Sequence, residues 1–200
     1  MKKKMGYLVL IFMIGGIFIY QTLVIRKQSK LVYNLSGSNA KLTHNLGKLK
    51  GNFIAAWQLE RATFLSDRIY DEEGKEIEYK FLTRTHPKLI FRFSKVDCSK
   101  CVVEQINLIR ELIKNKDIEY MMVCDYTNKR NLGLFKRTNA ITNTVYNCEK
   151  MLKDEKKTPF FCIYDKGIVT DVFFPDSDFP DMTNKYFKEI STKYFASKDH

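Results

Sequence analysis

The chain alternates between apolar runs of strand length and segments whose apolar positions recur at helical spacing. Lys88–Ser94 places Leu89, Phe91 and Phe93 on one face, which predicts a buried strand. After a polar turn, the segment up to Lys114 predicts an amphipathic helix with polar residues on its opposite face. Its apolar positions are Val102, Ile106, Ile109 and Ile113.

Similar patterns continue to the C-terminus. Ile118–Tyr126 is a continuous apolar run and predicts a second strand, parallel to the first because a helix connects them. Asn143–Leu152 fits no element. The other predicted elements are a hairpin at Phe64–Leu82, a surface helix at Thr127–Asn139, a second hairpin at Phe160–Tyr164 and Ile168–Phe174, and a helix at Met182–Phe195. This order predicts an α/β fold with a mixed sheet.

The N-terminal segment is strongly apolar. Tyr7–Ile25 contains nineteen residues without a charge, enough for a helix to cross a hydrocarbon core of ~30 Å. The segment ends in Leu-Val-Ile-Arg-Lys, which offers no small residues for cleavage. We therefore expect an uncleaved, single-pass anchor at residues 1–30 rather than a cleaved signal peptide. A short basic N-terminus inside would place the rest of the chain on the extracytoplasmic (periplasmic) side of the inner membrane.

Residues 31–63 predict a helical stalk. Leucines and other apolar residues follow a spacing of three and four, which suits an amphipathic helix, whereas Asn39 and Glu60 fall on its apolar seam and Gly47 and Gly51 weaken it. One interpretation is a dimerising coiled coil. Because the run is short, we favour a single helix that packs on its own domain or on the membrane surface, with Trp57 packed where stalk and domain meet. Residues 64–200 form the third predicted part.

The formal net charge of +11 does not indicate a nucleic-acid partner. Residues 1–30 carry six of these positive charges and no acidic residue. Basic residues that flank an apolar segment are ordinary for a membrane anchor, and no nucleic-acid recognition motif accompanies the others. We expect the membrane, and not a nucleic acid, to be the partner of this basic N-terminus.

Two cysteines mark the turn between the first predicted strand and its helix. Cys98 falls at the helix tip and Cys101 one turn into the helix. A helix N-terminus presents free N–H groups and the positive end of the helix dipole, and both favour a thiolate. Since the thiolate is the nucleophile in disulfide exchange, this placement predicts a dithiol switch.

The order of elements resembles the thioredoxin-like superfamily. The resemblance rests on strand–CxxC–helix at Leu89–Lys114, on Thr158-Pro159 before a strand, and on the hairpin and helix that follow. The earlier hairpin at Leu65–Phe81 is similar to the extra N-terminal element of membrane-anchored extracytoplasmic thiol–disulfide oxidoreductases of the TlpA-like group. The resemblance implies a thioredoxin-like mixed central sheet flanked by helices, without a cofactor or metal.

The resemblance also implies roles for individual residues. Cys98 would be the attacking thiol and Cys101 the resolving thiol, while Pro159, in cis, would shape the groove for a substrate chain. Thr158 would offer backbone hydrogen bonds to that chain. Next to the cysteines, Asp97, Ser99 and Lys100 would tune the pair, with Lys100 favouring a thiolate and Asp97 opposing it.

Three positions depart from the thioredoxin pattern. Asp97 stands where thioredoxins usually have Trp, and Lys100 stands where they have Pro. Arg92 occupies the position, six residues before the first cysteine, where many members carry a buried acid. Glu104 or Asp125 is a candidate to replace that acid.

The sequence thus predicts a membrane-tethered thiol–disulfide oxidoreductase. Through Cys98 and Cys101 it would exchange disulfides with extracytoplasmic proteins. The similarity to TlpA-like proteins favours a reductant, which would need an electron donor across the membrane. The alternative is a tethered binding or adaptor module without redox turnover, and the departures at Asp97 and Arg92 support it.

The other cysteines carry less information. Cys124 and Cys162 fall on predicted central strands and are expected to be small buried hydrophobes. Cys148 lies in the unassigned segment and could pair with another cysteine, and an odd count of five leaves at least one thiol unpaired. Zinc binding at Cys98 and Cys101 would need two more ligands, but there is no second CxxC and the histidines are scattered.

Overall fold

The structure is a computed structural model of the 200-residue chain. It describes residues 2–63, 68–78, 86–113, 118–126, 128–155 and 157–195, without the side chains of residues 2–12, 14 and 113. The chain forms two compact units, Met1–Lys50 and Gly51–His200. The predicted division at residues 30 and 63 stays a prediction.

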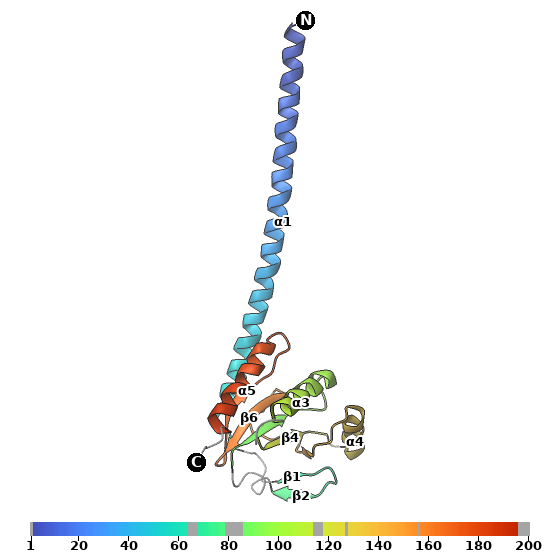
Figure 1. The fold of residues 1–200 in the computed structure, drawn as a ribbon, viewed down its shortest axis with the longest axis vertical. Coiled ribbons are helices and arrows are strands. Elements are labelled where there is room, and N and C mark those ends of the chain that lie inside the picture. Colours follow the sequence, from blue (N-terminus) through green and yellow to red (C-terminus); the bar gives the residue numbers. More distant parts are fainter. Residues whose placement is uncertain are drawn as a thin grey trace. The chain divides into compact units, whose positions relative to one another are not determined.

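The first unit is helical. Helix α1 runs over Lys2–Leu59 and so includes the predicted apolar segment and most of the predicted stalk (Figure 1). Within the described residues, none of the helices combines the length and the apolar character that crossing a membrane would require. Since the side chains of residues 7–12 and 14 are outside the description, the anchor at residues 7–25 stays a prediction.

The second unit is built on one mixed sheet of seven strands in the order β2-β1-β5-β4-β3-β6-β7. Strand β3 runs parallel to β4, as predicted, and β4 runs parallel to β5. Strand β6 is antiparallel to β3, and both hairpins are antiparallel. The strands are β1 (Arg68–Tyr70), β2 (Glu76–Glu78), β3 (Lys88–Arg92), β4 (Tyr120–Cys124), β5 (Val145–Asn147), β6 (Phe160–Asp165) and β7 (Ile168–Phe173).

Each face of the sheet has its own apolar layer. On one face, Phe91 and its neighbours pack with helices α3 (Ser99–Ile113), α4 (Lys129–Thr138) and α5 (Pro180–Tyr194) (Figure 1). On the other face, Ile90 packs in a cluster that includes Leu59 from the end of α1. Successive strand residues point to opposite faces, so Phe91 and Ile90 belong to different layers.

The segment after α1 also protects an edge of the sheet. The Arg61 N–H donates to the Val169 carbonyl at 2.7 Å, and the Val169 N–H donates to the Ala62 carbonyl at 2.9 Å. These bonds satisfy backbone groups of β7, which is an edge strand. An open edge invites pairing with another chain, and this short segment occupies part of it.

Most predicted elements of the second unit are confirmed, with two differences. The segment that could not be assigned contains β5, a three-residue strand too short to show a period. Trp57 was expected to pack, but its side chain is 73% exposed, so that prediction is wrong. Parts of the predicted first hairpin, residues 64–67 and 79–82, lie outside the described residues.

Candidate dithiol site

The site lies at the end of β3, where two carboxylates hold the loop that leads to the cysteines. The Ser94 N–H donates to Asp97 at 2.6 Å, and the Ser94 hydroxyl donates to Asp125 at 2.7 Å. The Lys95 N–H also donates to Asp125, at 2.7 Å. Asp125 directly follows β4, and because β3 and β4 are parallel, both strands end at the same edge of the sheet.

This loop delivers Cys98 to the start of α3. The Val102 N–H donates to the Cys98 carbonyl at 3.0 Å, so Cys98 is the residue that begins the helical hydrogen-bond pattern. Its side chain is exposed, whereas that of Cys101 is half-buried, and both are free thiols. The predicted placement of Cys98 at the helix tip and of Cys101 one turn into the helix is confirmed.

The two thiols interact directly. The Cys101 N–H donates to the Cys98 sulfur at 3.4 Å. A hydrogen bond from the Cys101 thiol lowers the pKa of Cys98 below its usual 9.0, and the N–H groups of Cys101 and Lys100 lower it further. The same thiol–thiol hydrogen bond, together with burial, raises the pKa of Cys101. The arrangement therefore separates an ionisable, exposed thiol from a protonated, protected one.

Asp97 connects the cysteine loop to the loop of Thr158 and Pro159. The Thr158 hydroxyl donates to Asp97 at 3.0 Å, and the Thr158-Pro159 peptide bond is cis, as predicted. Burial and the nearby Asp125 carboxylate raise the pKa of Asp97, against the hydrogen bonds from Ser94 and Thr158 that lower it. One carboxylate thus joins two segments that are 61 residues apart in the sequence.

The other two predicted tuning residues lie at the exposed start of α3. Ser99 is its first residue and is exposed. Lys100 has a side chain that is 86% exposed and lies 4.0 Å from Glu104. The negative charge of Glu104 raises the pKa of both cysteines. Sequence reasoning named Glu104 and Asp125 as candidates for a missing acid; the Glu104 side chain is 52% exposed, and Asp125 accepts hydrogen bonds from Ser94 and Lys95.

A buried ion pair occupies the position where many thioredoxins carry an acid. Arg92 is 1% exposed and its Nε donates to Glu155 at 2.8 Å. Glu155 also accepts the N–H groups of Met151 and Leu152, at 3.1 and 3.2 Å. The pair ties β3 to the segment before Pro159. Sequence reasoning missed Glu155; an Arg inside a strand of buried residues was the signal that a partner acid is needed.

The remaining three cysteines are buried. Cys124 and Cys162 are fully buried, as expected, and burial raises the pKa of Cys124 to about 12 and that of Cys162 further. Cys148 is buried and donates its S–H to the Lys150 carbonyl at 3.3 Å. All five cysteines are free thiols, and the described residues contain no group of three or more side chains arranged to hold a metal ion.

No protein-family model matches the chain, and no curated protein matches its sequence. An uncharacterized thioredoxin-like protein from Porphyromonas gingivalis is similar in structure, with a TM-score of 0.51, 14% identity, and coverage of 70% of this chain and 99% of its own. The thioredoxin domain of a thiol-disulfide oxidoreductase from Bacteroides vulgatus gives a TM-score of 0.46 with 10% identity; the match covers 64% of this chain and 96% of that domain. A thiol peroxidase from Chromobacterium violaceum gives a TM-score of 0.45 with 12% identity; the match covers 65% of this chain and 87% of the peroxidase chain.

The Porphyromonas structure is matched over nearly its whole length. The sheet order, the strand–CxxC–helix unit and the cis-proline before β6 all lie in the second unit. The second unit of this chain therefore has the thioredoxin-like fold.

Proposed function

We propose that this chain is a thiol–disulfide oxidoreductase that acts through Cys98 and Cys101. The observation that carries the proposal is the hydrogen bond from the Cys101 N–H to the exposed Cys98 sulfur at the start of α3, in a pair where the pKa of Cys98 is lowered and that of Cys101 is raised. Disulfide exchange needs this asymmetry, because the attacking thiol must ionise first, whereas the resolving thiol must stay protonated until the mixed disulfide has formed.

The first step is attack of the Cys98 thiolate on a disulfide of a substrate protein. A bond forms between the Cys98 sulfur and one substrate sulfur, the substrate S–S bond breaks, and the other substrate sulfur leaves as a thiolate. Cys98 is exposed, so a large partner can reach it. The N–H groups at the start of α3 stabilise the thiolate before attack.

The second step closes the dithiol. Cys101 loses its proton, attacks the Cys98 sulfur and releases the substrate as a second thiol, so the substrate gains two electrons and the Cys98–Cys101 pair loses two. The Cys101 N–H lies 3.4 Å from the Cys98 sulfur, which places the two residues close enough for this step. A donor of two electrons must then reduce the pair again.

The loop of Thr158 and Pro159 provides one wall for a bound substrate chain. Its link to Asp97 fixes this wall relative to Cys98. Val96, two residues before the attacking cysteine, is 81% exposed and offers an apolar contact. We propose that an extended substrate segment lies between these two features, with its disulfide at Cys98.

We further propose that residues 7–25 anchor the chain in the inner membrane and that the thioredoxin-like unit faces extracytoplasmic proteins. The support is the uncharged stretch of nineteen residues with basic residues on both sides. In that compartment protein disulfides form and persist, so substrates for exchange are present. The electron donor would act from across the membrane.

The test is a trapping experiment with the full-length protein. Cys101→Ser keeps the attacking thiol and removes the resolving one, so incubation with a protein disulfide should accumulate a mixed disulfide at Cys98. Cys98→Ser is the matched control and should accumulate none. A Cys101→Ser protein that forms no mixed disulfide would support the alternative, a tethered binding module without redox turnover.

A further inference from the structure

The part of α1 between Val32 and Leu49 repeats its apolar side chains every seven residues. With the heptad positions written a to g, leucines occupy every d position of three successive heptads. The a positions are Val32, Asn39 and Leu46, and the d positions are Leu35, Leu42 and Leu49. Leucine at d with a β-branched residue and one asparagine at a is typical of the contact surface of a two-stranded coiled coil. We call these six residues the α1 seam.

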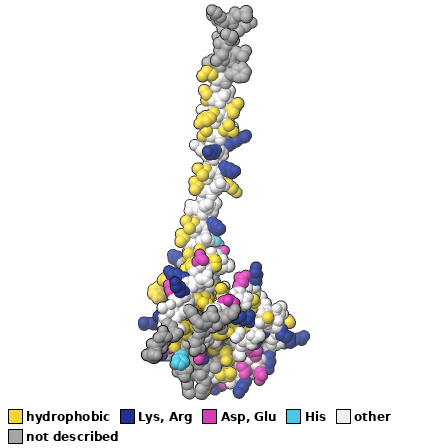
Figure 2. All heavy atoms as spheres, viewed as in Figure 1, with side chains coloured by type: hydrophobic (Ala, Val, Ile, Leu, Met, Phe, Trp, Pro, Cys, Tyr) yellow, Lys and Arg dark blue, Asp and Glu magenta, His cyan; other side chains and the backbone are white. Residues whose placement is uncertain are grey.

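Most of the α1 seam is exposed to solvent. Leu35 is 59% exposed, and Leu42 and Leu46 are each 58% exposed. Figure 2 shows apolar side chains that remain uncovered along this helix. Single exposed leucines are ordinary on a protein surface, but a row of apolar side chains interrupted only by Asn39 indicates a surface for a partner.

The helix also has little to stabilise it on its own. The first acidic residue of the chain is Glu60, so residues 31–50 cannot form the ion pairs between successive turns that support isolated helices. Gly37 and Gly47 lie inside the helix with nothing near them, and glycine is unfavourable there. Most helices in proteins depend on packing of an apolar face.

The residues beside the seam fit a second copy of the same chain. Within the span from Leu35 to Leu49, the flanking e and g positions are uncharged; they are Ser36, Ser38, Thr43 and Asn45. The basic residues Lys41 and Lys48 fall at c, and His44 falls at f, away from the seam. Two identical helices can therefore meet along the seam without like charges opposite each other.

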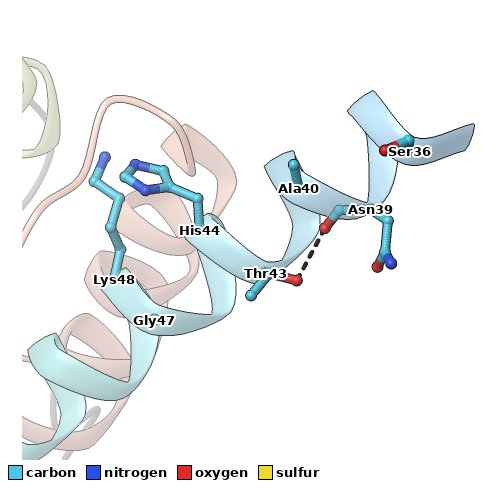
Figure 3. Close-up of a pocket in the computed structure, with 7 residues that line it drawn as sticks. All are labelled: Ser36, Asn39, Ala40, Thr43, His44, Gly47 and Lys48. Carbon is cyan, nitrogen blue, oxygen red and sulfur yellow. Dashed lines mark hydrogen bonds between the residues drawn. The ribbon is translucent and has the colours of Figure 1, made fainter. Parts of the chain in front are cut away.

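Asn39 supplies the register. Figure 3 shows its side chain projecting from the helix, one turn before Thr43, whose hydroxyl donates to the Asn39 carbonyl at 2.9 Å. The side-chain amide itself has no hydrogen-bond partner among the described residues. In parallel dimers a single asparagine at a pairs with the same asparagine of the other helix, and any shifted alignment would leave it opposite an apolar residue.

In place of the single helix favoured from the sequence, and because the α1 seam is exposed, we propose that residues 32–49 form a parallel, two-stranded coiled coil with a second copy of this chain, aligned through Asn39. The coiled coil does not depend on the dithiol chemistry. Its parallel direction agrees with the proposed anchor, because two copies inserted in one membrane enter it with the same orientation. The anchor would also raise the effective concentration of the two seams.

The test is cysteine cross-linking of the full chain purified in detergent. Cys98→Ser and Cys101→Ser together remove the exposed and the half-buried thiol, while the other three cysteines stay because they are buried. Leu42→Cys places a thiol in the seam, and His44→Cys is the matched control on the opposite side of the helix. Under mild oxidation, Leu42→Cys should form a disulfide-linked dimer at least tenfold faster than His44→Cys.

Leu35→Cys, one heptad away, distinguishes parallel from antiparallel helices. It also gives a second seam position in case the substitution at residue 42 disturbs the helix locally. An antiparallel pair brings two copies of the same residue together at only one level, so rapid cross-linking at both 35 and 42 requires parallel helices. Equal rates at Leu42→Cys and His44→Cys, or no dimer at either seam position, would overturn the proposal. Protection of Leu42→Cys from a water-soluble maleimide by lipid vesicles, without cross-linking, would also overturn it and assign the seam to a membrane surface.

Discussion

At the residue scale, the chemistry of the site depends on one hydrogen bond between two thiols. Cys98 and Cys101 are equivalent in composition but not in environment. The bond from Cys101 lowers the pKa of Cys98, and because the bond is shared, it raises the pKa of Cys101. The exposed sulfur is therefore the first of the two to ionise as the pH rises.

Removing the Cys101 thiol should make Cys98 less reactive near pH 7. In Cys101→Ala the pKa of Cys98 rises toward its usual 9.0, and because alkylation follows the thiolate fraction, the alkylation rate at pH 7 should fall. Iodoacetamide labelling across pH, read by mass spectrometry, measures this midpoint. Cys101→Ser retains a hydroxyl donor, so its labelling midpoint should lie between those of the wild type and Cys101→Ala. An unchanged midpoint in Cys101→Ala would show that the thiol hydrogen bond does not control Cys98.

Asp97 acts as a positioning residue, since it contacts Ser94 and Thr158 rather than a reacting sulfur. Asp97→Ala removes both hydrogen bonds and should lower the free energy of unfolding by about 1 kcal/mol. It should also slow exchange with a protein disulfide several-fold, because the Pro159 loop is no longer fixed, while the rate with dithiothreitol changes little. Equal loss with both substrates would contradict the positioning role.

Asp97→Asn is the conservative control and gives a pH signature. An asparagine can accept from Ser94 and donate to Thr158, so exchange with the protein disulfide should be restored. The pKa of Asp97 in the folded protein is raised above 3.8, so the folded chain binds this proton more tightly than the unfolded chain. The wild-type protein therefore loses stability as the pH rises from below 3.8 through the raised pKa of Asp97. The stability of Asp97→Asn relative to the wild type should therefore increase from pH 3 to neutral.

At the element scale, the buried pair of Arg92 and Glu155 joins β3 to the segment before the cis-proline. Glu155→Gln has nearly the same shape but leaves the Arg92 charge unpaired inside the protein. Breaking a buried pair in this way should cost about 3 kcal/mol of unfolding free energy, measured by urea denaturation. Glu119→Gln is the control, because its pair with Lys88 is partly exposed and should cost about 0.5 kcal/mol. Similar losses in both variants would contradict a structural role for the buried pair.

The elements that could be predicted from the sequence are those with a clear period or a fixed chemical marker. Strand β3, helix α3 and the parallel strand β4 follow from apolar spacing, and the CxxC pair marks the boundary between strand and helix. Strand β5 could not be found because its three residues are too few to show a period. Trp57 was expected to pack where stalk and domain meet, but it is exposed, and the identity of one side chain does not determine its burial.

The residues of the candidate site could be predicted from the sequence, but the hydrogen bonds and ion pair that link them could not, because these are tertiary contacts. Cys98 and Cys101 were identified from their place between a predicted strand and a predicted helix, and Thr158 and Pro159 from the resemblance to thioredoxin-like proteins. The Asp97–Thr158 hydrogen bond joins residues 61 positions apart, and the Arg92–Glu155 pair joins residues 63 apart. No local pattern encodes either contact, because the partners meet only when β3 and β6 pair in the sheet.

At the scale of the whole molecule, the chain joins a thioredoxin-like unit to a proposed membrane anchor at residues 7–25. A charge inside that segment should be costly in a bilayer, by about 2.5–3.5 kcal/mol at its centre. Ile17→Asp should therefore shift the protein from the membrane fraction to the soluble fraction after alkaline extraction, while Ser29→Asp, outside the segment, should not. Complete extraction of the wild type by alkali would contradict the anchor.

The central claim, that Cys98 and Cys101 form a reversible dithiol switch, is tested most directly by a redox titration of the full-length protein. The protein is equilibrated in glutathione or dithiothreitol buffers, alkylated and analysed by mass spectrometry to identify which cysteines are paired at each potential. The account predicts that Cys98 and Cys101 pair with each other in one two-electron transition, while Cys124, Cys148 and Cys162 stay reduced. Failure of Cys98 and Cys101 to pair, or pairing of either with a buried cysteine, would contradict the account.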